Sequence, residues 1–285
     1  MMKKITLAFI SALAALLLAS GSAFAGGNDI DFSRLCGING CTEAAVNQFK
    51  TLARAYSSLL APMHFQPAST LGEAGFEVAV ESKMSFSISD DPSWKATNAN
   101  DGKNPDENGN YSAPDLFATV QLHMRKGLPF SLEVEGIFNW LADSEIFYVG
   151  VGLRWAITEG WWFLPDISVR AHAGTIVGAS QFILINLNVD AAISYTWSLG
   201  GICAITPYAG YSLLSSWASS HVFLVNMYGV NGSISMEEQV FDRTHSFMHR
   251  GFVGLEFKGD FFVFGAEGEF GKDVMSVGVK IGANF

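Results

Sequence analysis

Charged residues are scarce in this 285-residue chain: Asp, Glu, Lys and Arg make up 15% of it, against about a quarter in an ordinary soluble domain. Basic residues are the scarcer kind, with 17 Lys and Arg facing 27 Asp and Glu. Because binding to a phosphate backbone needs clustered cations, this balance excludes nucleic acid as an expected partner. Long apolar runs are also missing after residue 25, where none approaches the ~20 residues of a membrane-spanning helix.

The first 25 residues have the pattern of a secretory signal peptide. Lys3 and Lys4 give a positive start, residues 5–18 form an apolar core, and Ala23-Phe24-Ala25 is a small-x-small cleavage site before Gly26. The alternative, an N-terminal membrane anchor, is disfavoured because the core is too short and a cleavage site follows it. We therefore expect an exported protein whose residues 1–25 are removed.

Apolar residues are abundant, at 49% of the chain, and they alternate with polar ones. The C-terminal segment shows this most clearly, since Met275, Val277, Val279, Ile281, Ala283 and Phe285 would share one face of a strand. Ser276, Gly278, Lys280, Gly282 and Asn284 would share the other face. Period-two alternation predicts strands that are apolar on one side and polar on the other.

A strand that ends the chain on an aromatic residue resembles the closing strand of a bacterial outer-membrane β-barrel. In that superfamily the terminal aromatic, here Phe285, is part of the assembly signal. The resemblance covers residues 71–285. It implies an outer-membrane location, contact with outer-membrane lipid, recognition by the barrel-assembly machinery, and small solutes as possible partners.

We predict an all-β fold: a transmembrane antiparallel up-and-down β-barrel of about ten strands, preceded by a short helical segment. The strands are expected near 71–88, 113–126, 130–142, 145–157, 163–177, 182–197, 202–216, 247–258, 261–271 and the C-terminal segment ending at Phe285. The long polar segments 89–112 and 217–246 fall on odd-numbered connections, where outer loops belong, and short turns fall on even ones. The residues from His221 to Val230 are interpreted as a β-extension of an outer hairpin.

Aromatic residues support the same assignment of long loops to the outer side and short turns to the periplasmic side. The periplasmic level of the barrel would carry a girdle, where amphipathic rings prefer to lie. Its expected members are Trp155, Trp161, Trp162, Trp197 and Phe285.

Residues 26–70 differ from the barrel and are predicted to form a periplasmic disulfide loop plus a helix. Cys36 and Cys41 bracket a tight turn and favour a disulfide over half of a metal site, because no second Cys/His pair lies nearby. Thr42 is the expected N-cap of a helix reaching about Leu60. Its apolar face would lie in the barrel mouth, against the periplasmic rim or in the membrane interface. Cys203 has no assigned role.

The predicted lumen is rich in charge and allows two interpretations. A ring of carboxylates favours a path for cations, whereas paired charges would simply fill a barrel close in size to the filled eight-stranded ones. The candidate lumen residues are Glu77, Glu81, His123, Arg125, Glu133, Glu135, Arg154, Asp166, Arg170, His172, Asp190, Glu256, Glu267, Glu269 and Lys280.

Several glycines also face inward in this register. They would leave room for a small pore, a ligand cavity or the inserted 42–60 helix, or they would only ease strand curvature. They are Gly150, Gly152, Gly174, Gly254, Gly265, Gly278 and Gly282.

An enzyme is a further possibility, because omptin proteases are also ten-stranded barrels. Asp90 and Asp91 in the first outer loop and Asp242 and His245 in the last long one could activate water. However, the omptin Asp-x-His spacing is absent, and no G-x-S-x-G motif exists. We therefore predict no enzymatic activity, no cofactor and no metal.

The sequence is compatible with two main functions. The first is a narrow or gated pore for small solutes. The alternative is a closed structural or surface-interaction barrel acting through its outer loops, with an omptin-like hydrolase a distant third. The loop 217–246 is apolar for an exposed segment and would either form a contact patch or pack over the barrel mouth. Its apolar residues are Trp217, Phe223, Leu224, Met227 and Tyr228.

Overall fold

The chain forms a closed antiparallel barrel of ten strands, as predicted. The computed structural model describes residues 26–36, 40–86, 88–161, 163–200, 203–229, 232–272 and 274–285. For 222–239 it describes the backbone alone. The predicted signal peptide and Trp162 lie outside the described residues.

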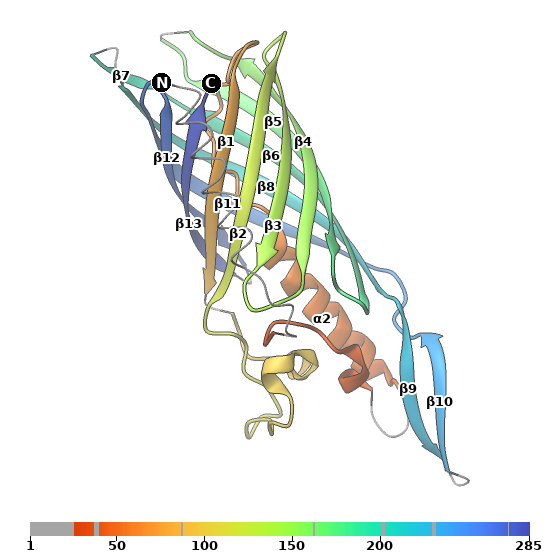
Figure 1. The fold of residues 1–285 in the computed structure, drawn as a ribbon. Coiled ribbons are helices and arrows are strands. Elements are labelled where there is room, and N and C mark those ends of the chain that lie inside the picture. The colour runs from red at the N-terminus through yellow and green to blue at the C-terminus, as the bar shows by residue number, and fades with distance from the viewer. Residues whose placement is uncertain are drawn as a thin grey trace, which may run out of the picture.

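The barrel strands follow one another around the wall in chain order (Figure 1). β11 pairs with both β8 and β12, and β13 pairs with β1, which closes the ring. The ten strands are β1 (Phe76–Phe86), β2 (Phe117–Leu128), β3 (Leu132–Leu141), β4 (Phe147–Thr158), β5 (Asp166–Val177), β6 (Phe182–Ser194), β8 (Cys203–Ser220), β11 (Thr244–Lys258), β12 (Phe262–Gly271) and β13 (Met275–Asn284).

Three further strands do not add to the wall. The short β7 (Trp197–Leu199) pairs with the start of β8. β9 (Val222–Gly229) and β10 (Gly232–Gln239) form a separate two-stranded sheet that extends past one end of the barrel (Figure 1). The predicted β-extension of the outer hairpin is therefore confirmed.

The two barrel ends differ in their connections. We call one the turn end: it carries the short connections around 129–131 and 259–261, and Phe285, whose backbone pairs with Phe76. The other is the cap end: it carries the long connections between β1 and β2 and between β8 and β11. The predicted alternation of short and long connections is confirmed.

The first strand is shorter than predicted, and the seventh is longer. β1 begins at Phe76 rather than near 71 because the chain turns before it, with Gly72 at a φ of 76°. Glycine adopts this left-handed conformation at no steric cost. β8 continues to Ser220, since its pairing with β6 runs to Phe182.

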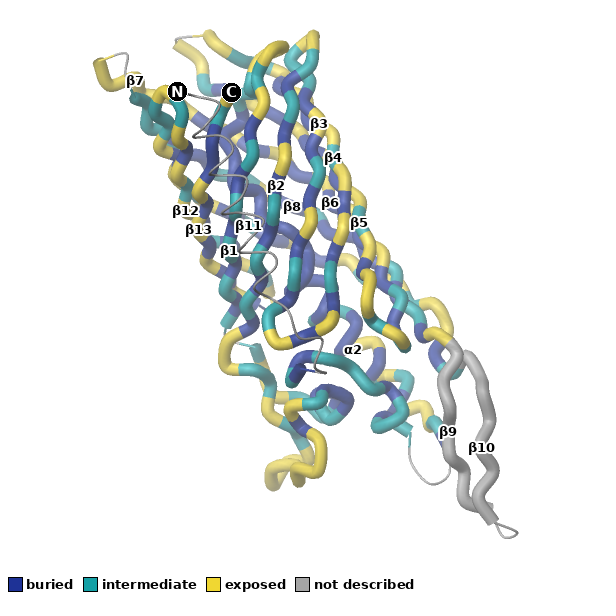
Figure 2. Tube along the Cα trace, viewed as in Figure 1, coloured by how far each residue is buried: buried dark blue, intermediate teal, exposed yellow. Residues whose placement is uncertain are grey.

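Burial alternates along the strands, with one residue facing the lumen and the next facing outward (Figure 2). In β6 every second residue from Phe182 to Ser194 is buried. The pattern matches the faces predicted from the sequence. A one-residue register error would have inverted every side chain.

A small folded cap covers the barrel at the cap end. We define the cap as the described residues of 26–60 and 88–113. It contains η1 (Phe32–Leu35), α2 (Glu43–Leu60), η2 (Pro92–Ala96) and η3 (Asn98–Asn100). Cys36 and Cys41 form a disulfide, as predicted. The helix follows the predicted bounds with Thr42 as its N-cap residue, although the Thr42 side chain makes no capping hydrogen bond.

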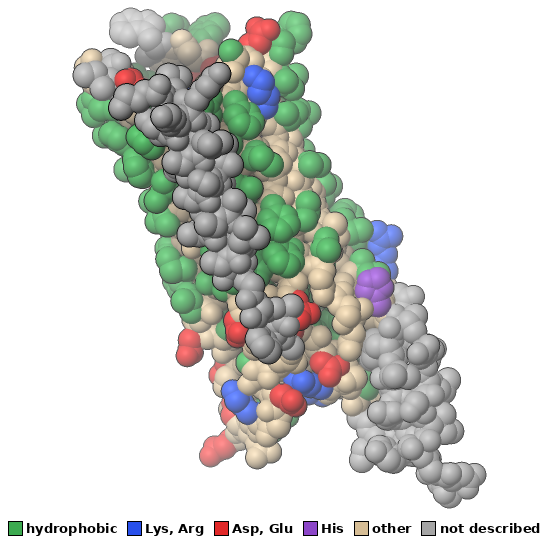
Figure 3. Space-filling model, in the orientation of Figure 1, with side chains coloured by type: hydrophobic (Ala, Val, Ile, Leu, Met, Phe, Trp, Pro, Cys, Tyr) green, Lys and Arg blue, Asp and Glu red, His purple; other side chains and the backbone are tan. Residues whose placement is uncertain are grey.

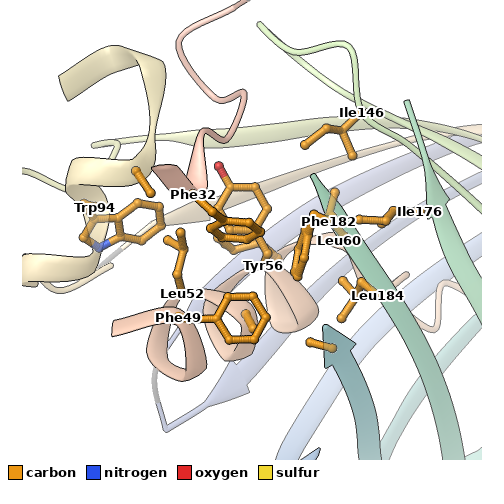
Figure 4. Close-up of a cluster of buried hydrophobic side chains, with 14 of the residues drawn as sticks. Phe32, Phe49, Leu52, Tyr56, Leu60, Trp94, Ile146, Ile176, Phe182 and Leu184 are labelled. Carbon is orange, nitrogen blue, oxygen red and sulfur yellow. The ribbon is translucent and has the colours of Figure 1, made fainter. Parts of the chain in front are cut away.

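The cap shares one aromatic core with the inner barrel wall (Figure 4). Phe49 of α2 stacks on Phe241 at 4.7 Å between ring centroids. Tyr56 meets Phe117 of β2 edge to face at 5.6 Å. Burying such rings stabilises a structure by roughly 25 cal/mol per Å² of apolar surface. The cap is thus anchored by its apolar face, as the helical periodicity predicted.

The position of this segment differs from the prediction. The sequence predicts residues 26–70 on the periplasmic side, which is the side of the short turns and Phe285. The structure places α2 at the opposite end, with the long connections (Figure 1). Of the three predicted sites for the helix, the barrel mouth is therefore the observed one. The sequence could not reveal this, because it depends on the path of residues 61–71.

Among the described residues, no helix has the length and hydropathy needed to cross a membrane.

Candidate functional site

Residues 61–71 connect α2 at the cap end to β1 at the turn end, and they run through the barrel lumen. We call this segment the lumen strap. Fully extended, a chain of this length spans about 36 Å, which exceeds the ~25 Å height of a barrel's apolar band. Met63, His64, Phe65, Gln66 and Ala68 of the strap are 2% exposed or less. The strap therefore occupies the interior in which a pore was expected.

Acidic residues of the wall and of the turn between β4 and β5 accept the strap's backbone N–H groups. Glu267 accepts from His64 N at 2.8 Å and from Phe65 N at 2.6 Å. Nearer the turn end, Glu133 accepts from Leu71 N at 3.1 Å and Glu159 accepts from Thr70 N at 2.8 Å. Hydrogen bonds to ionised groups are stronger than neutral ones. These carboxylates therefore hold an extended peptide without any strand pairing.

Basic residues of the wall bind the strap's carbonyl groups and the end of α2. Lys83 Nζ donates to Ser58 O at 3.0 Å and to Ala61 O at 2.9 Å. These carbonyls lie at the helix C-terminus, where the helix dipole favours a cation. Arg154 donates to Pro67 O further along. Both kinds of backbone group on the strap are thus satisfied by charged side chains.

The strap's side chains join the same network. Gln66 Nε2 donates to Glu135 at 3.0 Å, and Gln66 Oε1 accepts from Arg125 at 2.7 Å. His64 lies 3.6 Å from the Asp190 carboxylate and stacks on Phe252 at 4.5 Å between centroids. The strap is therefore bound by the lumen along its length rather than merely enclosed by it.

The wall residues also pair with one another. Glu133 lies between Arg125 and Arg154 at 3.2 and 2.7 Å. Lys280 contacts Glu256 at 2.6 Å and Glu77 at 3.3 Å. Because removing one partner leaves a buried charge uncompensated, a single substitution in such a pair typically costs about 3–5 kcal/mol. This arrangement corresponds to the interpretation of the lumen as a salt-bridge network.

A histidine occupies the centre of this network. His123 contacts Glu81 through Nδ1 at 2.8 Å and Glu135 through Nε2 at 3.2 Å. Arg170 in turn contacts Asp190 at 2.5 Å and Glu135 at 3.5 Å. Glu135 therefore joins the histidine, an arginine and the strap's Gln66 in one connected group.

Every predicted lumen residue faces inward and is buried, with exposure of 9% or less. Most belong to the network just described. Asp166 lies instead at the turn end, where it accepts the backbone N–H of Gly160 at 3.0 Å. His172 packs beside Tyr148, and neither of its ring nitrogens has a hydrogen-bond partner among the described residues.

Two basic residues of the network were missed. Lys83 lies 3.6 Å from Glu269, and Arg250 lies 2.9 Å from the same carboxylate. Both follow the inward parity of their strands, Lys83 two residues after Glu81 and Arg250 six residues before Glu256, so the same alternation predicts their orientation. The strap residues His64 and Gln66 carried no comparable signal.

The inward glycines leave no open space at four positions. A Cβ on Gly150 would lie 2.5 Å from the His172 ring, and one on Gly174 would lie 2.4 Å from the Tyr148 hydroxyl. A Cβ on Gly254 would meet Tyr208, and one on Gly278 would lie 2.3 Å from the Phe65 ring of the strap. These glycines make room for large neighbours rather than for the 42–60 helix.

The outer surface of the barrel is apolar. Val151, Leu153 and Ile281 are 67%, 49% and 51% exposed. Figure 3 shows hydrophobic side chains along the visible wall, with acidic and basic ones at both ends of the barrel and more of them at the cap end. Closed strand pairing with an apolar exterior and a polar interior satisfies every backbone group within a membrane. The fold is that of a bacterial outer-membrane β-barrel.

The aromatic girdle of this outer-membrane barrel lies at the turn end. Trp155, Trp161, Trp197 and Phe285 are about half exposed there, at 49%, 57%, 55% and 52%. The placement agrees with the prediction for these four residues. The role of Phe285 as an assembly signal stays a prediction.

No protein-family model matches the chain, and no curated protein matches its sequence. Solved structures with a similar fold include the attachment invasion locus protein Ail of Yersinia pestis. It is 14% identical, with a TM-score of 0.27, over 75% of this chain and 99% of Ail. Omp33 of Acinetobacter baumannii is 12% identical, with a TM-score of 0.28, over 76% of this chain and all of Omp33.

The translocator domain of the autotransporter NalP from Neisseria meningitidis is a third similar structure. It is 8% identical, with a TM-score of 0.35, over 84% of this chain and 95% of that domain. The strand pairing and the apolar outer surface of the chain itself identify the barrel.

Three candidate residues for a hydrolytic site, Asp90, Asp91 and His245, have other partners. Asp90 accepts the backbone N–H of Ala113, and Asp91 caps η2 by accepting that of Ser93. His245 bonds Ser215 Oγ at 2.8 Å and lies against Trp217. Within the described part of the chain, no hydrogen bond or ion pair joins either aspartate to His245. The side chains of Phe223, Leu224, Met227 and Tyr228 lie outside the described residues.

Proposed function

We propose that this protein is a plugged outer-membrane barrel, closed to solutes at rest, that holds a folded cap at the cell surface. The lumen strap carries this proposal, because it runs along the lumen of the ten-stranded barrel and its residues 61–68 are buried there. Strands and strap together leave the charged lumen residues buried. The proposal includes no catalytic step.

The cap and the β9–β10 hairpin are the parts that such a barrel would display. Both lie at the end with the long connections, which outer-membrane barrels place outside the cell. Binding residues often lie on loops held by a rigid scaffold. A surface-interaction role therefore accounts for a cap that is folded, disulfide-linked and fixed to the wall.

A gated pore is the second candidate, and one observation favours it. Glu267 has three hydrogen-bond donors: His64 N, Phe65 N and the Tyr208 hydroxyl at 2.9 Å. No ion pair to Glu267 is found among the described residues. If the strap left the lumen, Glu267 would lose two of these donors, and water molecules entering the emptied lumen would replace them. A strap that moves would then open a narrow path lined by charge.

Planar-bilayer conductance separates the two candidates. The protein spanning 26–285 is expected to be silent once its folding is verified by heat-dependent gel mobility. Stepwise currents from that protein would contradict the closed barrel. A second protein that lacks 26–70, also verified as folded, is expected to conduct if the strap alone blocks the path. Its silence would exclude the gated pore.

A set of four substitutions tests the role of the lumen charges directly. Glu133, Glu135, Glu267 and Glu269 are changed to Gln together. A change in the ion selectivity of the currents supports a pore, whereas a loss of stability without currents supports the salt-bridge network.

The display of the cap is tested by labelling intact cells with a membrane-impermeant maleimide. Cys203 lies at the turn end and forms no disulfide, so the native protein supplies the internal control. A Lys103→Cys variant should be labelled while Cys203 is not. Labelling of Cys203 alone would reverse the orientation and contradict the display of the cap.

A further inference from the structure

A groove of about 420 Å³ lies on the outer face of the wall, across β11, β12 and β13. Ala266 and Gly268 of β12 form its floor, since they are the smallest outward-facing residues of that strand. Its two sides are apolar side chains of the flanking strands, which are 43% to 52% exposed. They are Val253 and Leu255 of β11 and Val277 and Val279 of β13. The groove therefore opens away from the lumen and the strap.

The groove continues along β11 toward the cap end. Gly251 is the next outward-facing residue past Val253, and a Cβ there would meet nothing within 4 Å. His249 follows at the next outward position and is exposed. His249 and Leu255 lie about 20 Å apart along the strand, at ~3.4 Å per residue. One leaflet is half of the ~30 Å hydrocarbon core of a bilayer, so this line is long enough for an acyl chain.

The position of His249 along β11 corresponds to the outer boundary of the apolar band. Lys258 ends the same strand at the turn end, nine residues further along the chain. Nine residues extend over ~31 Å, and the usual strand tilt of about 40° reduces this to ~23 Å of height. The apolar band of such barrels is ~25 Å tall. His249 therefore lies at headgroup level on the side of the cap.

Hydrogen-bond donors and positive charge gather at that level. The Tyr211 hydroxyl and His249 Nδ1 share a hydrogen bond on the outer face of the wall. When the hydroxyl donates, the ring proton lies on Nε2, which can then donate to a ligand. Lys272 lies in the turn just beyond Gly271, which pairs with Arg250, the neighbour of His249. Lys272 is exposed and makes no ion pair with the described residues.

We propose that this groove binds one anionic lipid of the leaflet at the cap end. An acyl chain would lie over Gly251 and Gly268, and the lipid phosphate would contact His249 and Lys272. Basic side chains at the membrane surface bind anionic headgroups, and a phosphate accepts strong hydrogen bonds from charged donors. Burial of the chain adds roughly 25 cal/mol per Å² of apolar surface.

The charges of the wall favour a lipid over a second copy of this chain. In the described part of the barrel, no Asp or Glu faces outward on any of the ten strands. A second wall packed against the groove would therefore bring no partner for Lys272. An anionic lipid supplies both the apolar chain and the counter-charge.

Native mass spectrometry of the full folded protein in detergent tests the proposal. The probes are dioleoyl phosphatidic acid and dioleoylglycerol, which share their chains and differ in the phosphate. One molecule of phosphatidic acid per barrel should be retained, and Lys272→Gln should weaken its binding about fivefold. His249→Phe keeps a ring but removes the N–H, so it should weaken phosphatidic acid alone. Lys103→Gln, an exposed charge in the cap loop, should bind like the native protein.

A second pair of variants tests the groove itself. Gly268→Leu fills the floor and should abolish retention of the lipid. Gly136→Leu places the same side chain on the outer face of β3, where a Cβ meets nothing within 4 Å, and should have no effect. Heat-dependent gel mobility verifies the folding of each variant.

Equal retention of the two lipids would overturn the proposal, as would unchanged retention in Gly268→Leu or in Lys272→Gln. A native dimer that Gly268→Leu converts to a monomer would assign the groove to a second copy and overturn the lipid site as well.

Discussion

Glu267 and His64 are 203 residues apart in the chain, yet the Glu267 carboxylate accepts the backbone N–H of His64 at 2.8 Å. Its second oxygen accepts the next N–H, that of Phe65, at 2.6 Å. One wall residue therefore fixes both the position and the direction of the strap at mid-lumen.

Replacing Glu267 by Gln should loosen the strap. The amide keeps the size of the side chain but offers one acceptor oxygen in place of two, and its NH₂ group then faces a backbone N–H. An unmade buried hydrogen bond costs about 1–3 kcal/mol. We expect brief channel openings in bilayers where the native protein is silent. Glu107→Gln, an exposed change in the cap loop, should stay silent, and equal silence of both variants would contradict the prediction.

Gly278→Val should displace the strap through steric contact. The added Cβ would lie 2.3 Å from the Phe65 ring and 2.9 Å from Met63 Sδ. Overpacking of this kind typically costs about 1–3 kcal/mol, which would appear as a lower unfolding temperature. In the double variant Gly278→Val/Phe65→Ala the obstructing ring is gone, so its loss of stability should be smaller than the sum of the losses in the two single variants. Gly136→Ala is the control, because a Cβ at Gly136 meets nothing within 4 Å. Strict additivity would show that Phe65 does not contact this wall.

Tyr56→Phe should weaken the cap while leaving the barrel intact. The Tyr56 hydroxyl donates to Asn28 O at 2.7 Å inside the core, and burial raises the pKa of this phenol above its usual value. Loss of the hydroxyl leaves the buried Asn28 carbonyl without its hydrogen-bond donor, which costs about 1–3 kcal/mol of stability. Hydrogen exchange should become faster across 43–60 and stay unchanged in the strands. Asn47→Ala, on the exposed side of the same helix, should show neither effect.

The turn at 106–110 should respond to acid. Backbone N–H groups of Asn110 and Asn108 donate to the Asp106 carboxylate at 2.8 and 2.9 Å, and they lower its pKa. A carboxylate with a lowered pKa in the folded state stabilises the turn above the ordinary pKa of about 3.9. That contribution disappears as the pH falls through the lowered value. The amide resonance of Asn110 should report this titration, and an Asp106→Asn variant should lose it.

The barrel wall could be predicted from the sequence, because the alternation of apolar and polar residues within each strand shows which side chains face the lumen. Glu133 and Glu135 alternate with Leu132 and Val134, so a single strand decides which residues face the lumen. The positions of the two long loops in the sequence then predicted which strand ends lie at the cap end and which lie at the turn end. Lys83 of β1 and Arg250 of β11 obey the same rule.

The strap could not be predicted in the same way. Residues 61–71 pair with side chains from strands scattered over the whole chain, such as Glu133, Arg154 and Glu267. Neither periodicity nor a local motif encodes such contacts. The alternation predicts that Gly278 faces inward. The reason for a glycine there is the Phe65 ring packed against it, and Phe65 is more than 200 residues away in sequence.

The strap is tethered to β1 by only a few residues, and this makes it an intramolecular ligand. A short tether holds a ligand at an effective concentration in the millimolar range. A free peptide or solute that competes for Glu267 and Arg154 must exceed that concentration or bind far more tightly. Any opening of the lumen would consequently reverse by itself, with no partner needed to close it.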